Sequence, residues 1–317
     1  MTETFVLYSN VAVYSAMAIY TIAFIMFTLD LSRRSVSVPA PRAARIPSSS
    51  VGSTAVLERV DAPANTRTKG PRYLRMAFAL TVIGWALHVG ATIFRGFAAG
   101  RVPWANMFEF SLTATAIIVG VFLLVQFWQD LRFLGSFVVG FALIALGIAT
   151  TNFYVDVVPL PPALQSAWLV IHVFVASLGT GFFALGAALA IVQLLQARRA
   201  AGRAVRLRFL DTLPGADALE TLAYRLIVVG FVFWTFTLIA GAVWAERAWG
   251  RYWGWDTKEV WTFIIWTIFA GYIHARATRG WRGSRSAWLA IIGFGAVVFN
   301  FTVVNLFFKG LHAYSGL

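Results

Sequence analysis

The chain has 317 residues, of which 59% are hydrophobic and 12% charged, and its mean hydropathy is +0.74. These values exclude an ordinary soluble domain and indicate a polytopic membrane protein, in which the net charge of +13 reflects topology and not nucleic-acid binding. The sequence has no cysteine, which excludes a disulfide, a thiolate metal site and a thiol nucleophile.

Eight apolar runs are long enough to cross a bilayer, which needs roughly 20 residues per helix. In chain order they lie near 5–29, 75–97, 107–128, 134–151, 167–196, 223–245, 259–276 and 287–308. The sequence therefore predicts an all-α polytopic membrane protein with about eight transmembrane helices. An even number of crossings places both termini on the same side of the membrane.

Lys and Arg residues gather in alternate connections between these runs. Nine lie in 30–75, six in 197–225 and four in 276–286. Because cytoplasmic loops are enriched in positive charge, these connections are expected to be cytoplasmic and both termini to face outward.

Three parts follow along the chain. Residues 1–31 are predicted to form the first transmembrane helix and 73–317 a seven-helix domain. Residues 32–72 are rich in Pro, Ser, Ala and Arg without periodic apolar positions, so a disordered basic cytoplasmic linker that touches anionic lipid is expected. Further on, Asp217 and Glu220 have the spacing of a capping box and predict the start of a short helix before the sixth run.

The chain has four histidines, and helix parity sorts them into two pairs. His172 near the outer end of the fifth run and His312 after the eighth run are both expected at the outer surface. His88 and His274 are expected inside the membrane, on the second and seventh runs, at imperfectly matched depths. A histidine in a membrane helix is costly unless it has a partner, although that partner can simply be a neighbouring helix.

Two pairs of imidazoles suit haem, whose iron accepts axial ligands from opposite faces. A zinc site is less favoured, because the chain lacks cysteine and has few carboxylates near these positions. A proton relay stays open, since histidine titrates near neutral pH.

An aromatic segment, Arg247 to Trp261, lies between the sixth and seventh runs and is also expected to be outer. Its rings could form the walls of a haem site, and its cations could meet the propionates. The rings are Trp249, Tyr252, Trp253 and Trp255, and the outer cations are Arg95, Arg101, Arg247, Arg251 and Lys258. The alternative is an interfacial belt of anchoring rings, but a belt usually needs only one or two.

The run W-G-R-Y-W-G-W-D-T-K-E, Trp249 to Glu259, resembles the WWD signature of haem-handling proteins in cytochrome c maturation. The chain is most similar to the CcsA/ResC family of the System II machinery, in its actinobacterial CcsB-type branch. The similarity begins near residue 71 and includes "PWANMFEF" from Pro103, "IHVFVASLGTG" from Ile171, "IHARATRGWRG" from Ile273 and "GLHAYSG" from Gly310. Thr257 stands where the family usually has Pro, and Phe108 where it often has Tyr.

This resemblance implies two sites for haem b in transit. His172 and His312 match the family's outer iron ligands, and His88 and His274 match its intramembrane pair. The outer site would also include Trp249, Tyr252, Trp253, Trp255, Asp256, Arg251, Lys258 and Glu259. Glu109 is expected on the outer side as a supporting or gating residue.

The implied function is delivery of haem across the bacterial plasma membrane and its presentation, on the outer face, to the CxxCH thiols of an apocytochrome c. The chain would then be a component of a holocytochrome c synthase. The implied partners are a ResB-like membrane protein with a large outer domain and proteins that keep thiols reduced. Alternatives are a dihaem b-type subunit of a quinone oxidoreductase and a haem exporter or chaperone without a synthase role. A small-molecule transporter is less favoured, because no internal repeat is visible.

Overall fold

The computed structural model describes residues 1–37, 72–158, 165–204, 206–278, 280–308 and 310–312. Within them it contains nine α-helices and two short 3-10 helices. The helices are α1 (Thr2–Ser37), α2 (Arg72–Ala99), α3 (Met107–Val125), η1 (Arg132–Leu134), α4 (Gly135–Asn152), α5 (Ala167–Ala200), η3 (Arg208–Thr212), α6 (Ala216–Trp249), α7 (Thr257–Thr278), α8 (Ser284–Phe301) and α9 (Val303–Phe307). The all-α membrane fold is confirmed.

Each predicted apolar run coincides with a helix, and α8 with α9 forms the eighth. Seven of the described helices have the length and apolarity to cross a membrane. The helix at the seventh run, α7, is not among them. The apolar residues of α7 are flanked or interrupted by Lys258, Glu259, His274 and Arg276, and these polar residues lower the mean hydropathy of the helix.

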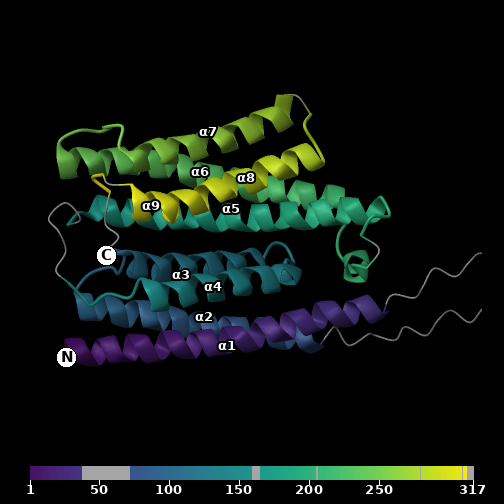
Figure 1. Cartoon of the computed structure of the whole chain (residues 1–317), viewed down its shortest axis with the longest axis horizontal. Helices are drawn as coiled ribbons and strands as arrows, with labels where there is room; N and C mark the ends of the chain where they lie inside the picture. Colours follow the sequence, from purple (N-terminus) through teal and green to yellow (C-terminus); the bar gives the residue numbers. More distant parts are fainter. Residues whose placement is uncertain (38–71, 159–164, 205, 279, 309, 313–317) are drawn as a thin grey trace, which may run out of the picture.

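The helices form two layers (Figure 1). One contains α1 to α4, with α1 packed along α2, and the other contains α5 to α9, with α5 packed along α6. Helix α5 joins the layers, because it contacts both α3 and α8. The start of α1, the end of α9 and the α6–α7 connection lie at the same end of the bundle (Figure 1).

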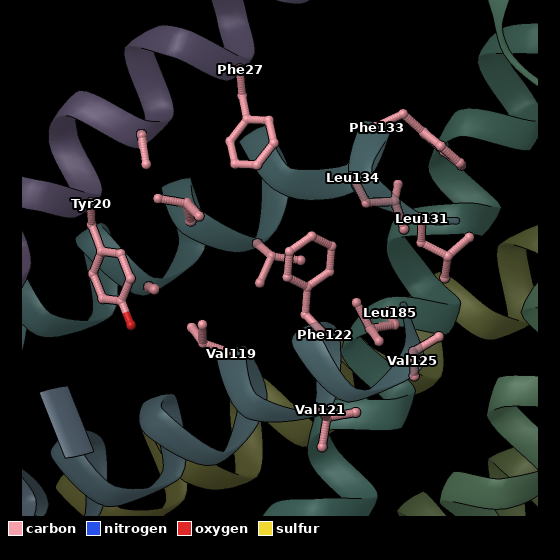
Figure 2. Close-up of a cluster of buried hydrophobic side chains, with 14 of the residues drawn as sticks. Tyr20, Phe27, Val119, Val121, Phe122, Val125, Leu131, Phe133, Leu134 and Leu185 are labelled. Carbon is pink, nitrogen blue, oxygen red and sulfur yellow. The ribbon is translucent and has the colours of Figure 1, made fainter. Parts of the chain in front are cut away.

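The core of the first layer surrounds α3, which is the most buried of the candidate spans. Figure 2 shows Phe27 of α1 and Phe122 of α3 lying toward Leu134, at the junction of η1 and α4. Phe27 packs directly on Gly135, where even one added Cβ would overlap its ring. This packing fixes the last turn of α3 against the first residues of α4.

Two expectations about helix ends need adjustment. Helix α1 continues to Ser37, six residues beyond the end of the first transmembrane helix predicted over 1–31, while 38–71 of the expected linker lie outside the described residues.

The prediction of a capping box at Asp217 and Glu220 is wrong. Helix α6 starts at Ala216, its N-cap is Gly215, and no side chain caps it. Glu220 is instead buried at the opposite end of the bundle from the α6–α7 connection. Its carboxylate accepts hydrogen bonds from Arg276 Nη1 at 3.1 Å and the Gly283 N–H at 2.9 Å. The arginine and the turn before α8 therefore compete successfully for the carboxylate that would have closed the box.

Candidate functional site

A cavity of about 410 Å³ lies among α3, α4, α5, α6, α7 and α8, at the end of the bundle that contains the α6–α7 connection. Its volume is within the range of cofactor-sized pockets, and most of its lining side chains are apolar. Six residues of the predicted outer site line it: His172, Tyr252, Trp253, Lys258, Glu259 and His312. The two histidines are therefore brought to one cavity, although 140 positions separate them in the sequence.

His172 lies in the second turn of α5 and faces α6. Its Nδ1 is 3.0 Å from the carbonyl oxygen of Thr237. A carbonyl can only accept, so Nδ1 carries the proton and donates, and Nε2 keeps its lone pair. Gly241 makes this position possible, because a Cβ there would lie 2.8 Å from Cε1 of the imidazole.

His312 follows α9 and is oriented in an equivalent way. Its Nδ1 is 2.9 Å from Oδ1 of Asp256. The Trp249 ring packs edge-on against the imidazole, with 4.8 Å between the ring centroids. The buried Trp244 ring also packs edge-on, with 5.4 Å between the centroids. A carboxylate behind an imidazole fixes the tautomer and makes the opposite nitrogen a better metal ligand. Both histidines therefore present Nε2 as an available ligand.

Asp256 organises the α6–α7 connection. Its Oδ1 accepts from His312 and from the backbone N–H of Lys258 at 3.0 Å, and its Oδ2 accepts from the backbone N–H of Leu311 at 2.8 Å. The hydrogen bond from His312 is the main cause that lowers the Asp256 pKa to about 2, and the Lys258 N–H adds to it. Asp256 is therefore a carboxylate at neutral pH, and it connects the aromatic loop to the segment that carries His312.

Lys258 and Glu259 begin α7 and are both held by polar groups. Lys258 Nζ donates to the Asn300 carbonyl at 2.8 Å and to Oδ1 of Asn305 at 2.7 Å. Glu259 Oε2 accepts from the N–H groups of Gly254 and Asp256, at 2.8 and 3.1 Å. These bonds fix the loop to the end of α8, so both side chains shape the cavity wall.

Four residues of the predicted outer site are not among those lining the cavity. Trp249 and Asp256 support His312 from behind. Arg251 is exposed, with its guanidinium folded over Gly254. Trp255 is 76% exposed, has a positive φ of 59° and contacts Trp253 edge-on. The aromatic loop thus contributes two rings to the cavity, Tyr252 and Trp253, and presents Trp255 outward.

The structure does not bring His88 and His274 together. His88 is fully buried on α2, where Nε2 donates to the Leu112 carbonyl at 2.9 Å and Nδ1 lies 3.4 Å from the Tyr20 hydroxyl. Both of its ring nitrogens are therefore engaged. His274 is exposed on α7, in the other layer. A haem held between this pair would require a different arrangement of the two layers.

Glu109 and two of the predicted outer cations form a buried ion-pair cluster beside the cavity. Arg95 Nε lies 3.2 Å from Oε1 of Glu109 and Arg101 Nη1 lies 2.6 Å from Oε2, with the Arg95 and Glu109 side chains fully buried. Arg95 Nη2 also donates to the Val155 carbonyl at 2.7 Å. The cluster connects α2, α3 and the segment before α5, and neither arginine lines the cavity.

Some lining residues were not identified from the sequence. Asn106 and Asn300 are buried polar residues of the cavity wall, and Trp244 contacts the rings of both outer histidines. "PWANMFEF" contains Asn106 in an N-cap position, which was a usable signal. Nothing in the local sequence of Asn300 or Trp244 distinguishes them from other polar or aromatic residues of an apolar helix.

Comparison with known proteins places these residues within a shared segment. Residues 104–312 match the family described as "Cytochrome C assembly protein". This range starts at Trp104 of the cavity wall and ends at His312, and it excludes His88. One relative, cytochrome c biogenesis protein CcsA of Trieres chinensis, is 34% identical over 255 residues, covering 70% of this chain and 81% of that protein.

A second relative is cytochrome c biogenesis protein CcsA of Synechococcus sp. (strain JA-3-3Ab). It is 34% identical over 291 residues, which cover 74% of this chain and 83% of that protein. Among solved structures, Cytochrome c Heme Lyase CcmF superposes with a TM-score of 0.63 at 16% identity. The match covers 94% of this chain but just 46% of CcmF, so it establishes a shared helical arrangement alone.

Proposed function

Because this chain belongs to the cytochrome c assembly protein family, we propose that it delivers haem and presents it for covalent attachment to apocytochrome c. The observation that carries the proposal is the pair of imidazoles at one cavity. His172 and His312 both have Nδ1 hydrogen-bonded to an acceptor and Nε2 available. Two neutral imidazoles with fixed tautomers are the ligand set of a bis-histidine haem.

The cavity also suits the rest of a haem b molecule. The porphyrin is flat and apolar, and the lining provides aliphatic and aromatic side chains such as Phe110, Phe301 and Trp253. Buried polar atoms without a hydrogen-bond partner in the described structure also face this space. Among those lining the cavity are Asn106 Nδ2, Glu259 Oε1 and Asn300 Oδ1. Such atoms are costly to bury unless a ligand or water satisfies them.

The chemistry asked of the site is addition of a thiol across a vinyl group. The S–H bond breaks, sulfur bonds to one vinyl carbon and hydrogen to the other, with no net oxidation or reduction. This chain has no cysteine, so both thiols come from the CxxCH motif of the substrate polypeptide. His172 and His312 hold the iron until the substrate's own histidine replaces one of them.

The sidedness of the site follows from charge. The cavity lies at the end of the bundle opposite the basic connections 197–225 and 276–286. Cytoplasmic loops retain positive charge, so the cavity faces outward across the bacterial plasma membrane. On that side the protein would meet its partners, which are the apocytochrome, thiol-reducing proteins and the outer domain of a ResB-like membrane protein. Of the alternative functions, a dihaem cytochrome b would need a second assembled histidine pair, and His88 and His274 do not form one.

The test is holocytochrome c formation in cells that co-express this chain, its membrane partner and a CxxCH reporter. We expect His172→Ala and His312→Ala each to reduce covalent haem in the reporter to background, with the membrane level of the protein unchanged. Asn152→Ala, an exposed change at the same end of the bundle, is the control and should leave the yield at the wild-type level. Normal maturation in both histidine variants would contradict the proposal.

A further inference from the structure

Asn106 occupies a position between a helix end and the cavity. It is the N-cap of α3, and its Oδ1 accepts a hydrogen bond from the Glu109 N–H at 2.9 Å. This bond fixes the amide orientation, since only the oxygen can accept. The side chain is 4% exposed and lines the cavity, while its Nδ2 has no partner among the described residues. A buried N–H₂ group is therefore left for whatever enters the cavity.

The surroundings of Asn106 are electropositive. The N-terminus of a helix carries a partial positive charge and unpaired N–H groups, and α3 has 19 residues. Beside it, Arg95 and Arg101 share the single carboxylate of Glu109, so the buried cluster keeps one excess positive charge. Arg95 Nη1 and Arg101 Nε are also buried without a partner in the described part of the chain. This wall of the cavity favours an anion.

The part of the wall that α7 and α8 form has the opposite character. Glu259 Oε1 and Asn300 Oδ1 are acceptors that lack a described partner, at the start of α7 and the end of α8. Lys258, the one lysine or arginine that lines this wall in the described part of the chain, already donates to the Asn300 carbonyl and to Asn305. A carboxylate placed at this wall would face oxygen atoms, whereas one placed at α3 would face donors.

We propose that Asn106 and the first turn of α3 bind a propionate carboxylate of the porphyrin substrate, with Asn106 Nδ2 as the donor. This subsite rests on the proposed function and determines how the porphyrin is rotated in the cavity. With a propionate bound there, the propionate-bearing edge of the porphyrin lies against the α3 wall. The opposite edge, which carries the vinyl groups in haem b, then lies away from α3.

The experiment compares two probes, haem and iron protoporphyrin IX dimethyl ester, whose propionates carry no charge. Purified full-length protein in detergent is titrated with each, and the binding is followed by the visible spectrum. Asn106→Asp is the informative variant, because aspartate is an equally good N-cap and keeps the bond to the Glu109 N–H. It replaces the donor with an anion, so we expect the affinity for haem to fall roughly tenfold or more and that for the ester to stay within about twofold.

Two further variants complete the design. Asn106→Ser keeps a capping oxygen but has no amide donor at this reach, and it should lower the haem affinity less than Asn106→Asp does. Asn152→Asp adds the same charge at an exposed site on α4 and should change neither affinity.

The subsite is overturned if Asn106→Asp leaves the ratio of haem to ester affinities at the wild-type value, whether both affinities persist or both fall together. It is supported if that ratio drops. The proposed function fails separately, if wild-type protein gives no bis-histidine spectrum with haem.

Discussion

The two histidine pairs of this molecule differ in what surrounds their ring nitrogens. His172 and His312 come from α5 and the segment after α9, and both line a common cavity while Nδ1 of each is held by an acceptor. His88 has both nitrogens engaged inside the first layer, and His274 is exposed on the second. Identical side chains thus differ in their ability to bind iron, because a histidine ligand needs one ring nitrogen that is hydrogen-bonded and one that is available.

Apart from removal of a histidine ligand, a change in the packing around His172 is expected to lower the haem affinity most. Gly241→Ala would place a methyl group 2.8 Å from Cε1 of His172, so the imidazole must move away from its Thr237 bond. We expect the haem affinity to fall roughly 10- to 100-fold, which is the usual loss when the hydrogen bond that orients a metal-binding histidine is disturbed. Gly271→Ala on α7 is the matched control, because an added Cβ there meets nothing within 4 Å. Equal haem affinity in the two variants would show that His172 is not the ligand.

The second prediction concerns the carboxylate behind His312. Asp256→Asn keeps the side-chain shape but removes the charge, and it weakens the acceptor that orients the imidazole. Loss of such supporting groups typically lowers metal affinity by about 10- to 100-fold, and we expect the lower end because the Trp249 and Trp244 rings also hold His312. The check is haem titration together with the iron(III)/iron(II) midpoint potential. A variant with unchanged affinity and potential would mean that Asp256 does not act through His312.

The third prediction separates His88 from His274. His88→Ala leaves the Leu112 carbonyl and the Tyr20 hydroxyl buried without their partner, so the free energy of unfolding should decrease by about 1–3 kcal/mol. His274→Ala changes an exposed side chain and should stay within about 0.5 kcal/mol. The measurement is thermal or denaturant unfolding of the haem-free protein in detergent.

The double variant His88→Ala/His274→Ala sharpens this contrast. The two effects should add to within about 0.5 kcal/mol, as they do for distant residues. Strong coupling, either in stability or in haem content, would instead show that the pair meets in a state that differs from the one described.

The smallest effect is expected at the most exposed ring of the aromatic loop. Trp255 is 76% exposed and does not line the cavity, so Trp255→Ala should change the haem affinity less than about twofold. Trp253→Ala removes a ring of the cavity wall and should reduce it more. A larger loss at Trp255 than at Trp253 would indicate that the loop rearranges when haem binds.

Much of the fold could be predicted, because membrane helices are long apolar runs whose signal is local. The outer site could also be found from parity and from the density of aromatic residues between Trp249 and Glu259. The partners of His88 could not, since Tyr20 and Leu112 are 68 and 24 positions away and are ordinary residues of apolar helices. Asn106 was visible as part of a motif, but its unsatisfied amide depends on the packing of α3 against helices distant in the sequence.

The central claim is that Nε2 of His172 and Nε2 of His312 bind one haem iron from opposite faces. Its most direct test is the visible and electron paramagnetic resonance spectrum of purified haem-loaded protein, with His312→Gly measured before and after addition of imidazole. We expect a six-coordinate low-spin signal in the wild type, a high-spin signal in the variant, and recovery of the low-spin signal when free imidazole fills the space left by the ring. A wild-type spectrum in both His312→Gly and His172→Gly, without imidazole, would contradict the claim.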